Sequence, residues 1–379
     1  MIDRLRSSFA LRLVSLSFIL VAACMFFDFL AMTAQDGVCY RHIVDFGFSS
    51  KLNPDPTVAD RGNVGFFPGY PLACYLVKKI LGLGTDAFPT TGALILTSNG
   101  FAVLLWVYLE KLLSLFGDQF SRAKMLMLAL YPYCFFFYCS YTESMFISMM
   151  IGFIYFSERW LREEDEKKSW RLFWLAVIHG FLMNFTRLVG FVIVLYPVIR
   201  AYQTGEKKLR ALLIAAFSLT SIGLFLAYCQ VKFGAWDFYF ISEKNVWNTY
   251  VDFSKLLPPT ELFNFSRPVH ADTVSKYVAI GLGVFLSVKL IQLIKEKLWL
   301  TPYFAMILCS GMLWGEYLLG RSSWNFSGLG RYLIPVFALI LPFLKIEPKF
   351  NWKWVTIGVV LLGFQIAYAL KFGRHGWVA

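Results

Sequence analysis

The sequence has few charged residues for its length. Of its 379 residues, 16% are charged, whereas 58% are hydrophobic and 18% aromatic. The mean hydropathy is +0.59. A soluble domain is about 25% charged and about 45–50% apolar, so this composition excludes a soluble globular enzyme and a disordered chain.

The sequence also lacks the short motifs that carry much of enzyme chemistry. It contains no Gly-rich phosphate loop, no nucleophile elbow, no HExxH pair and no compact set of metal ligands. The seven cysteines lie mostly inside apolar runs, without the pair spacing of a metal site or a disulfide framework. We therefore predict a protein that needs no metal and no cofactor.

The sequence consists largely of long apolar runs. A bilayer span needs about 20 mainly apolar residues, and the sequence predicts an all-α polytopic membrane protein with about eleven spans, the first an uncleaved signal anchor. The runs cover about 10–34, 88–109, 125–140, 144–160, 172–187, 188–203, 210–232, 277–294, 298–319, 331–344 and 353–371. No composition break divides them, so residues 1–379 are predicted to form one membrane domain.

The net charge of +12 would suggest nucleic acid as a partner of a soluble protein. Here the basic residues follow the predicted topology instead. With the N-terminus inside, 21 of the 36 Lys and Arg fall in short cytoplasmic segments, as the positive-inside rule requires. The charge therefore predicts orientation in a bilayer, with membrane lipids and not nucleic acid as its partner.

Two long segments lie outside the membrane on the same predicted face. Residues 35–87 form an outer loop in which a short apolar stretch with aromatics is followed by Lys78 and Lys79, a pattern typical of a helix in the membrane interface. Residues 233–276 form a second outer loop rich in Trp, Tyr, Phe and Pro. An active site on this face would be reached from the outer side.

Ionisable residues near the predicted span ends gather on this outer face. Charge close to lipid is costly and often marks function. A one-sided group favours a water-accessible reaction chamber, whereas a transport pathway would place such residues near the middle of the membrane. The residues are Asp36, His42, Asp45, Glu143, Arg187, Arg321 and Arg331.

The two carboxylates at span ends have two interpretations each. Asp36 could take a proton from a sugar hydroxyl as its oxygen attacks an anomeric carbon, or it could cap a helix. Glu143 could bind acceptor hydroxyls, or form a capping turn with Thr142 or Ser140.

The basic residues of this face are also ambiguous. Arg187 and Arg331 flank apolar runs with almost no loop around them. Each could snorkel to the lipid headgroups, or bind a phosphate, which the guanidinium fork suits well. His42 could likewise bind phosphate or make a structural contact.

Several short stretches, taken in order, resemble the PIG-V-like family, the relatives of GPI mannosyltransferase II among the GT-C membrane glycosyltransferases. They reach from about residue 36 to 340, and Gln35 stands where that family usually has an aromatic residue. The stretches are Asp36–Tyr40 with Asp45–Phe48, Phe66–Pro71, Tyr131–Pro132 with Tyr141–Phe146, Thr186–Gly190, and Gly330–Phe337.

The resemblance implies a GT-C-like fold with interfacial helices in the first outer loop, and an inverting transfer of a hexose, with mannose favoured. The donor would be a polyprenyl-phosphate sugar and the acceptor a glycan, lipid or protein. Asp36 would be the general base. Arg187, Arg331 and His42 would bind the donor phosphate, and Glu143, Tyr141, Tyr40 and Tyr70 the sugar or the acceptor.

The membrane implied is the inner membrane of a bacterium or archaeon, with a periplasmic or extracellular active side, or the ER membrane of a eukaryote. Two alternatives remain open. One is a flippase or transporter of lipid-linked sugars, which would form no glycosidic bond. The other is a GT-C enzyme that uses a different lipid-linked sugar.

Overall fold

The computed structural model describes residues 9–24, 32–50, 62–118, 121–247, 271–319, 329–344 and 352–374, and within them it contains helices and no strand. The first half comprises α2 (Phe9–Cys24), α3 (Asp36–Phe46), α4 (Gly69–Leu81), α5 (Thr90–Leu115), α6 (Ser121–Ala129), η3 (Cys134–Phe137), α7 (Glu143–Arg162) and α8 (Glu166–Thr186). The second half comprises η4 (Leu188–Val192), α9 (Leu195–Thr204), α10 (Lys208–Phe233), α11 (Phe238–Trp247), α12 (Ala271–Lys295), η7 (Leu298–Leu300), α13 (Pro302–Leu319), α14 (Leu329–Tyr332), α15 (Ile334–Ile340), η8 (Leu341–Phe343) and α16 (Trp352–Gly373).

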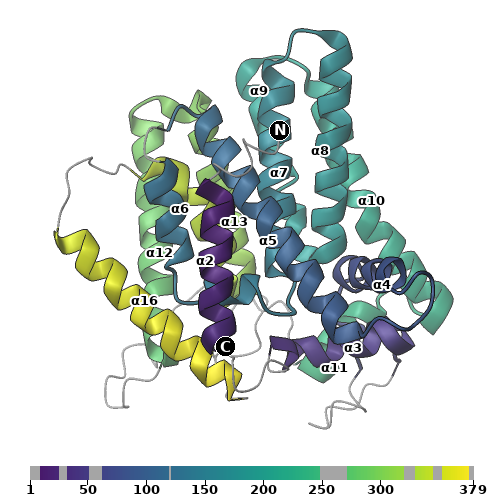
Figure 1. Ribbon diagram of the computed structural model, residues 1–379. Coiled ribbons are helices and arrows are strands. Elements are labelled where there is room, and N and C mark those ends of the chain that lie inside the picture. The colour runs from purple at the N-terminus through teal and green to yellow at the C-terminus, as the bar shows by residue number, and fades with distance from the viewer. Residues whose placement is uncertain are drawn as a thin grey trace.

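Helix α7 lies in the middle of a bundle of long helices. It packs against α5 on one side and α8 on another, and α8 packs in turn against α10 (Figure 1). Nearly every residue of α7 is buried, because α5, α8, α9 and α15 all contact this helix. Helix α7 nevertheless carries two buried carboxylates, Glu143 at its first residue and Glu158 in its last turn but one.

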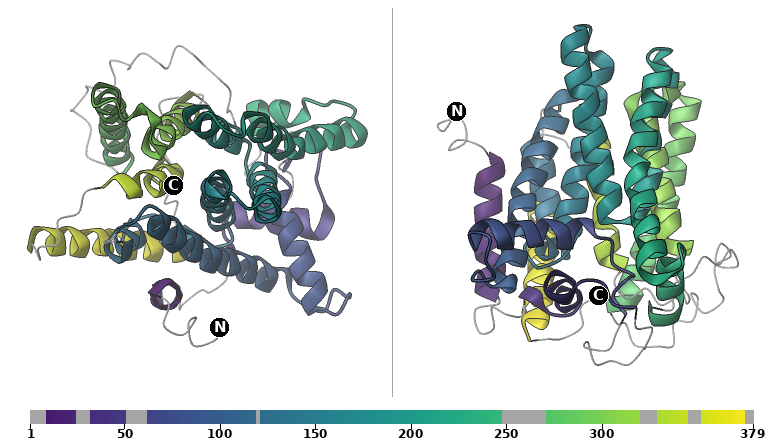
Figure 2. Two further views of the ribbon diagram at one scale, coloured as in Figure 1. Left: turned by 90° about the horizontal axis from the view of Figure 1, so that it is seen from above. Right: turned by 90° about the vertical axis from the view of Figure 1, so that its right-hand side faces the viewer.

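Helices α3 and α4 cross one end of this bundle, each at a steep angle to the long helices (Figure 2). The Asp45 carboxylate joins them, because it accepts hydrogen bonds from Lys78 of α4 at 2.9 Å and from Thr90 of α5 at 2.5 Å. The loop 35–87 thus contains helices, α3 and α4, and their position in the membrane interface stays a prediction. We call this end of the bundle the α3–α4 end.

Within the described ranges, three helices are long and apolar enough to cross a membrane: Thr90–Leu115, Lys208–Phe233 and Val355–Gly373. Shorter apolar helices accompany them. The chain is an integral-membrane protein with an all-helical fold, as predicted, and the number of eleven spans stays a prediction.

Three predicted spans are interrupted. The run 125–140 is not one helix: α6 ends at Ala129, and a turn and η3 precede α7. The run 188–203 divides into η4 and α9, and 331–344 divides into α14, α15 and η8. Proline explains part of this result, because Pro132 and Pro342 lack the N–H that a continuous helix needs.

The interruption before α7 positions the site. Residues 133–142 form a buried aromatic turn in which Phe135 stacks on Phe136 at 4.3 Å between ring centroids. The Ser140 backbone N–H donates to the Met32 carbonyl at 2.8 Å. This bond brings the start of α7 against the segment that leads into α3.

The second predicted outer loop, 233–276, contains α11 and the first residues of α12. Its middle, 248–270, lies outside the described residues, as does Arg321.

Candidate active site

Four elements meet at the α3–α4 end and bring together charged residues that are far apart in the sequence. Asp36 begins α3, Glu143 begins α7, Arg187 follows the last residue of α8, and Arg331 lies in α14. We call these four residues the Asp36 cluster. Four of the residues predicted at the outer face are thus joined in one site; His42 and Asp45 lie outside it, and Arg321 is not among the described residues.

Asp36 makes an ion pair with Arg331, a residue 295 positions later in the chain. Its Oδ2 lies 2.8 Å from Arg331 Nη1, and Oδ1 makes no hydrogen bond within the described part of the chain. The carboxylate is 17% exposed. One oxygen is therefore held in place while the other remains able to accept a proton.

Asp36 does not cap α3. The residue at the cap position is Gln35, whose side chain makes no capping bond and whose φ is 56°. A positive φ at a residue other than Gly or Asn is uncommon. The capping interpretation of Asp36 is wrong, and its carboxylate serves the contact with Arg331.

Glu143 lies between the two arginines. Its Oε1 is 2.5 Å from Arg187 Nη2 and 3.2 Å from Arg331 Nε, and the side chain is fully buried. Its Oε2 has no hydrogen-bond partner among the described residues. Because a buried carboxylate is costly unless it is paired, Glu143 depends on both arginines.

The capping turn that the sequence suggested at Glu143 is not formed. Thr142 occupies the cap position without a side-chain capping bond. Its hydroxyl instead accepts a hydrogen bond of 2.8 Å from Arg187 Nε. Thr142 thus orients Arg187, which holds the guanidinium plane against the start of α7.

Aromatic rings cover the guanidinium groups. The Arg331 guanidinium carbon lies 4.9 Å from the Tyr332 ring centroid, 5.0 Å from that of Tyr141 and 5.5 Å from that of Phe136. Arg331 Nη2 also donates to the Tyr332 hydroxyl at 2.9 Å. Rings at this distance stabilise a cation and keep bulk water away from it.

Two of the three guanidinium nitrogens of Arg331 donate hydrogen bonds, Nη1 to Asp36 and Nη2 to Tyr332. Its Nε lies 3.2 Å from Glu143 Oε1 as an ion pair without a hydrogen bond, and the side chain is only 8% exposed. Arg187 is somewhat more exposed, at 14%. Both guanidinium groups are therefore mostly buried.

The predicted tyrosines take different places around the cluster. Tyr141 lies beneath Arg331, and its hydroxyl is 3.4 Å from Gln35 Oε1. Tyr40 of α3 has the side chains of Asp36 and Thr142 near its hydroxyl. Burial, together with the negative charge of Asp36, raises the pKa of Tyr40 well above its usual value, so it is a neutral hydroxyl.

Tyr70 and His42 lie outside the group of direct contacts. The Tyr70 hydroxyl is buried against the Leu94 carbonyl and Ser98, at 3.1 and 2.7 Å. His42 Nδ1 lies 3.1 Å from Asn63 Nδ2. These contacts correspond to the structural interpretation of His42, and the phosphate role of His42 and the substrate role of Tyr70 stay predictions.

Two residues of the site were not predicted from the sequence. Tyr332 has no signal there beyond its position next to Arg331, with which it makes its hydrogen bond. Thr142 was considered only as a cap, because its contact with Arg187 joins segments 45 residues apart that the sequence does not show to be neighbours.

No group of three or more His, Cys, Asp or Glu side chains that could hold a metal ion occurs within the described residues. The two carboxylates of the cluster face arginines, whose charge already balances theirs. Independence of metal remains a prediction.

No family model and no curated protein matches the chain. Among solved structures, it is similar to the oligosaccharyltransferase of Archaeoglobus fulgidus in the apo form, with a TM-score of 0.50 and 10% identity over 98% of this chain and 56% of that one. A structure of archaeal oligosaccharyltransferase AglB from the same organism, in complex with an inhibitory peptide and a dolichol-phosphate, gives a TM-score of 0.48 at 10% identity with the same coverage. The chain therefore spans about half the length of these proteins.

The similarity at this identity concerns the fold. The chain is an integral-membrane protein with the GT-C fold, the fold class predicted from the sequence.

Proposed function

We propose that the chain is an inverting glycosyltransferase that moves a hexose, with mannose favoured, from a polyprenyl-phosphate carrier to a glycan, lipid or protein acceptor. The ordered stretches that resemble the PIG-V-like family support mannose, and the GT-C fold supports lipid-linked glycosyl transfer. The active side is the α3–α4 end, which the charge distribution assigns to the outer face of a bacterial or archaeal inner membrane, or to the lumen of the ER.

One observation carries the proposal: Asp36 has one oxygen fixed by Arg331 and the other without a partner in the described chain. A general base needs an accessible oxygen at a fixed position, within reach of the hydroxyl it deprotonates. The neighbouring Arg187 provides positive charge at the same site.

The reaction requires few protein groups. The acceptor oxygen attacks the anomeric carbon of the sugar, and the bond between that carbon and the phosphate oxygen breaks. The electron pair leaves with the polyprenyl phosphate, which needs no proton, and the acceptor proton passes to Asp36 Oδ1. One carboxylate suffices, in contrast to the two that a glycosidase uses.

We assign different tasks to the two arginines. Arg187, the slightly more exposed of the two at 14%, would stabilise charge on the departing phosphate. Arg331 donates hydrogen bonds to Asp36 and Tyr332, so it would orient the base. Glu143 would hold both arginines in position.

The test is mannose transfer from polyprenyl-phosphate mannose by the purified full-length protein in a bilayer. Asp36→Asn keeps the shape of the side chain but removes the base, and should lower kcat by about 10²–10⁴-fold. Asp45→Asn is the matched control, since Asp45 lies on the same helix but contacts Lys78 and Thr90. It should change kcat less than threefold.

Equal kcat in Asp36→Asn and the unchanged protein would remove Asp36 as the base. Movement of the lipid-linked sugar between leaflets without a new glycosidic bond would favour the flippase instead. Efficient transfer of a different sugar, with mannose excluded in competition, would correct the donor while keeping the reaction.

A further inference from the structure

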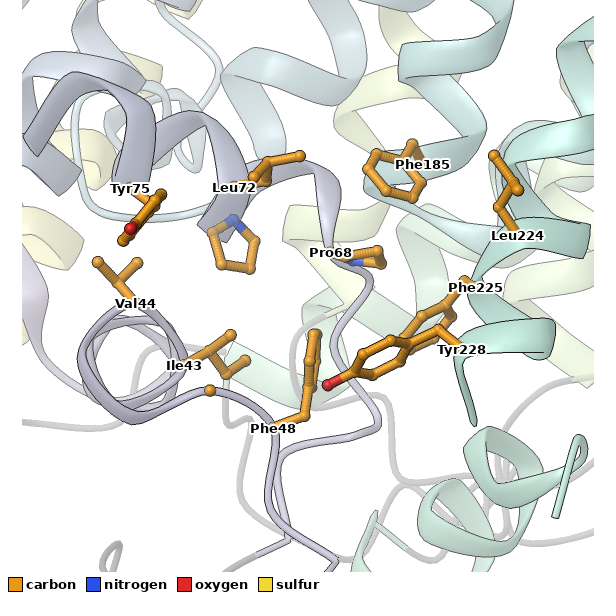
Figure 3. A pocket seen from close by; sticks show the side chains of 12 residues that line it. Ile43, Val44, Phe48, Pro68, Leu72, Tyr75, Phe185, Leu224, Phe225 and Tyr228 are labelled. Carbon is orange, nitrogen blue, oxygen red and sulfur yellow. The ribbon is translucent and has the colours of Figure 1, made fainter. Parts of the chain in front are cut away.

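An apolar cavity of about 420 Å³ is lined by residues of α3, α4, α8 and α10 and of the segments next to them. Its volume is in the range of small-molecule sites, about 300–1,000 Å³. Figure 3 shows side chains from all four helices around an open centre. The lining residues are Ile43, Val44, Gly47, Phe48, Pro68, Pro71, Leu72, Tyr75, Phe185, Leu224, Phe225 and Tyr228.

The cavity has a packed inner wall and an exposed edge. Phe225 is 1% exposed and contacts Phe48 at 5.6 Å between ring centroids. Leu72 and Leu224 are 46% and 57% exposed. In a protein that spans a membrane, an apolar edge of this kind faces lipid chains at no cost, and it admits a chain from the side.

Two connections link the cavity to the charged cluster. Phe185 lines the cavity, and Arg187 follows two positions later. A Cβ atom on Gly69 would lie 2.6 Å from the Phe185 carbonyl oxygen, so the start of α4 rests directly on the end of α8. On α3, Asp36 and Ile43 are seven residues apart, which is about 10 Å along a helix.

We propose that this cavity takes the first isoprene units of the carrier lipid and positions the phosphate at Arg187. The inference rests on the proposed function. A ligand that joins an apolar chain to an anionic head fits an apolar cavity next to a basic cluster. Phe185 of the lining precedes Arg187 by two residues, whereas Ile43 follows Asp36 by seven. We therefore assign the cavity to the lipid on the phosphate side of the donor and not to the acceptor.

The five aromatic rings of the lining favour a bulky, branched chain. Methyl branches and double bonds fill space between rings, whereas a straight alkyl chain of similar length leaves part of it empty and loses contacts. The remainder of a long carrier would extend past Leu72 and Leu224 into the bilayer.

The experiment measures binding of farnesyl phosphate and dodecyl phosphate to the full-length protein in nanodiscs. Leu224→Trp and Leu72→Trp place a large side chain at the exposed edge, where the fold can accommodate it, and fill the entrance. Each should weaken farnesyl phosphate binding about tenfold. Ile80→Trp is the matched control on α4, since Ile80 is 70% exposed and does not line the cavity.

The unchanged protein should prefer farnesyl to dodecyl phosphate, and both cavity variants should reduce that preference. Equal farnesyl phosphate binding in the cavity variants and in Ile80→Trp would overturn the proposal. A rise in the acceptor KM of the cavity variants, with donor binding unchanged, would also overturn it, because the cavity would then bind the acceptor.

Mannose transfer by the same preparations separates the two proposals. If no transfer occurs but the cavity variants lose farnesyl phosphate binding, the proposed function fails and the lipid site stands. If transfer occurs and farnesyl phosphate binding is unaffected, the lipid site fails and the proposed function stands.

Discussion

Helix α7 carries a buried glutamate near each end, and the two are surrounded differently. Glu143 belongs to the Asp36 cluster. Glu158, near the opposite end, faces Arg162, Tyr196 and Arg200, and we call these four residues the Glu158 cluster. Both carboxylates are fully buried.

In the Glu158 cluster, both oxygens of the Glu158 carboxylate accept hydrogen bonds. Oε1 accepts from Arg200 Nε at 2.5 Å and from the Tyr196 hydroxyl at 2.9 Å, and Oε2 accepts from Arg162 at 3.1 Å. In the Asp36 cluster, Glu143 Oε2 is buried without a hydrogen-bond partner among the described residues. Arg331 binds only the Oδ2 oxygen of Asp36, whose side chain is 17% exposed.

This difference in the hydrogen bonding of the carboxylate oxygens indicates that the Glu158 cluster is structural and that the Asp36 cluster is a candidate active site. A buried polar atom without a partner costs free energy, and folds that retain such atoms often do so at functional sites. Arg200 also donates to the Leu300 carbonyl at 3.2 Å, so the Glu158 cluster ties α7 and α9 to η7. Four changes test this contrast.

The largest effect is expected from Glu158→Ala. Removing one partner of a buried ion pair leaves the arginine charge uncompensated and costs about 3–5 kcal/mol. The midpoint of thermal unfolding in detergent should fall strongly, while the donor KM of the remaining folded protein stays within twofold. A normal unfolding midpoint would show that the Glu158 cluster does not stabilise the bundle.

Arg331→Ala should act on catalysis. Without Arg331 the base is no longer oriented, and kcat should fall by about 10²–10³-fold, with the donor KM within threefold. Arg331→Lys should restore little, since a single ammonium cannot face Asp36, Glu143 and Tyr332 together. A large rise in donor KM with kcat unchanged would instead make Arg331 a phosphate ligand.

Glu143→Gln should have an intermediate effect. Gln keeps the side-chain volume but removes the negative charge that holds the two arginines. A hydrogen bond to a charged group contributes about 1.5–3 kcal/mol of free energy. We expect kcat/KM to fall about 10–100-fold. The matched Glu158→Gln should lower the unfolding midpoint more and kcat/KM less, and the reverse order would contradict the contrast between the clusters.

Arg162→Ala should have the smallest effect. The Arg162 side chain is 45% exposed, and Glu158 keeps its hydrogen bonds from Arg200 and Tyr196 when Arg162 is removed. We therefore expect the loss of about one hydrogen bond, on the order of 1 kcal/mol. Both the unfolding midpoint and kcat should remain close to those of the unchanged protein. A loss of activity as large as that of Arg331→Ala would show that arginine removal in itself disturbs the enzyme.

The helical class and several helices were predictable, because they depend on local pattern. The apolar runs 88–109 and 210–232 correspond to α5 and α10, and the amphipathic stretch before Lys79 corresponds to α4. The run 125–140 was predicted wrongly, since its apolar composition resembles a span although the chain turns after Ala129. Composition alone does not distinguish a buried aromatic turn from a helix in lipid.

The candidate site was predictable as a list of residues and not as an arrangement. Asp36, Glu143, Arg187 and Arg331 were each singled out because charge beside apolar runs is unusual. The sequence did not show that Arg331 faces Asp36, nor that Glu143 faces both arginines. The local sequence favoured capping roles for Asp36 and Thr142. In the structure these side chains instead contact arginines from distant segments, Arg331 and Arg187.

The scarcity of charge thus determined that this chain is an all-helical membrane protein, because apolar runs of span length need a bilayer or a core around them. It also limited the number of candidate site residues. Only the tertiary structure decided how those residues pair. A buried charge must find an opposite charge in space, and the partner of Asp36 lies 295 residues away.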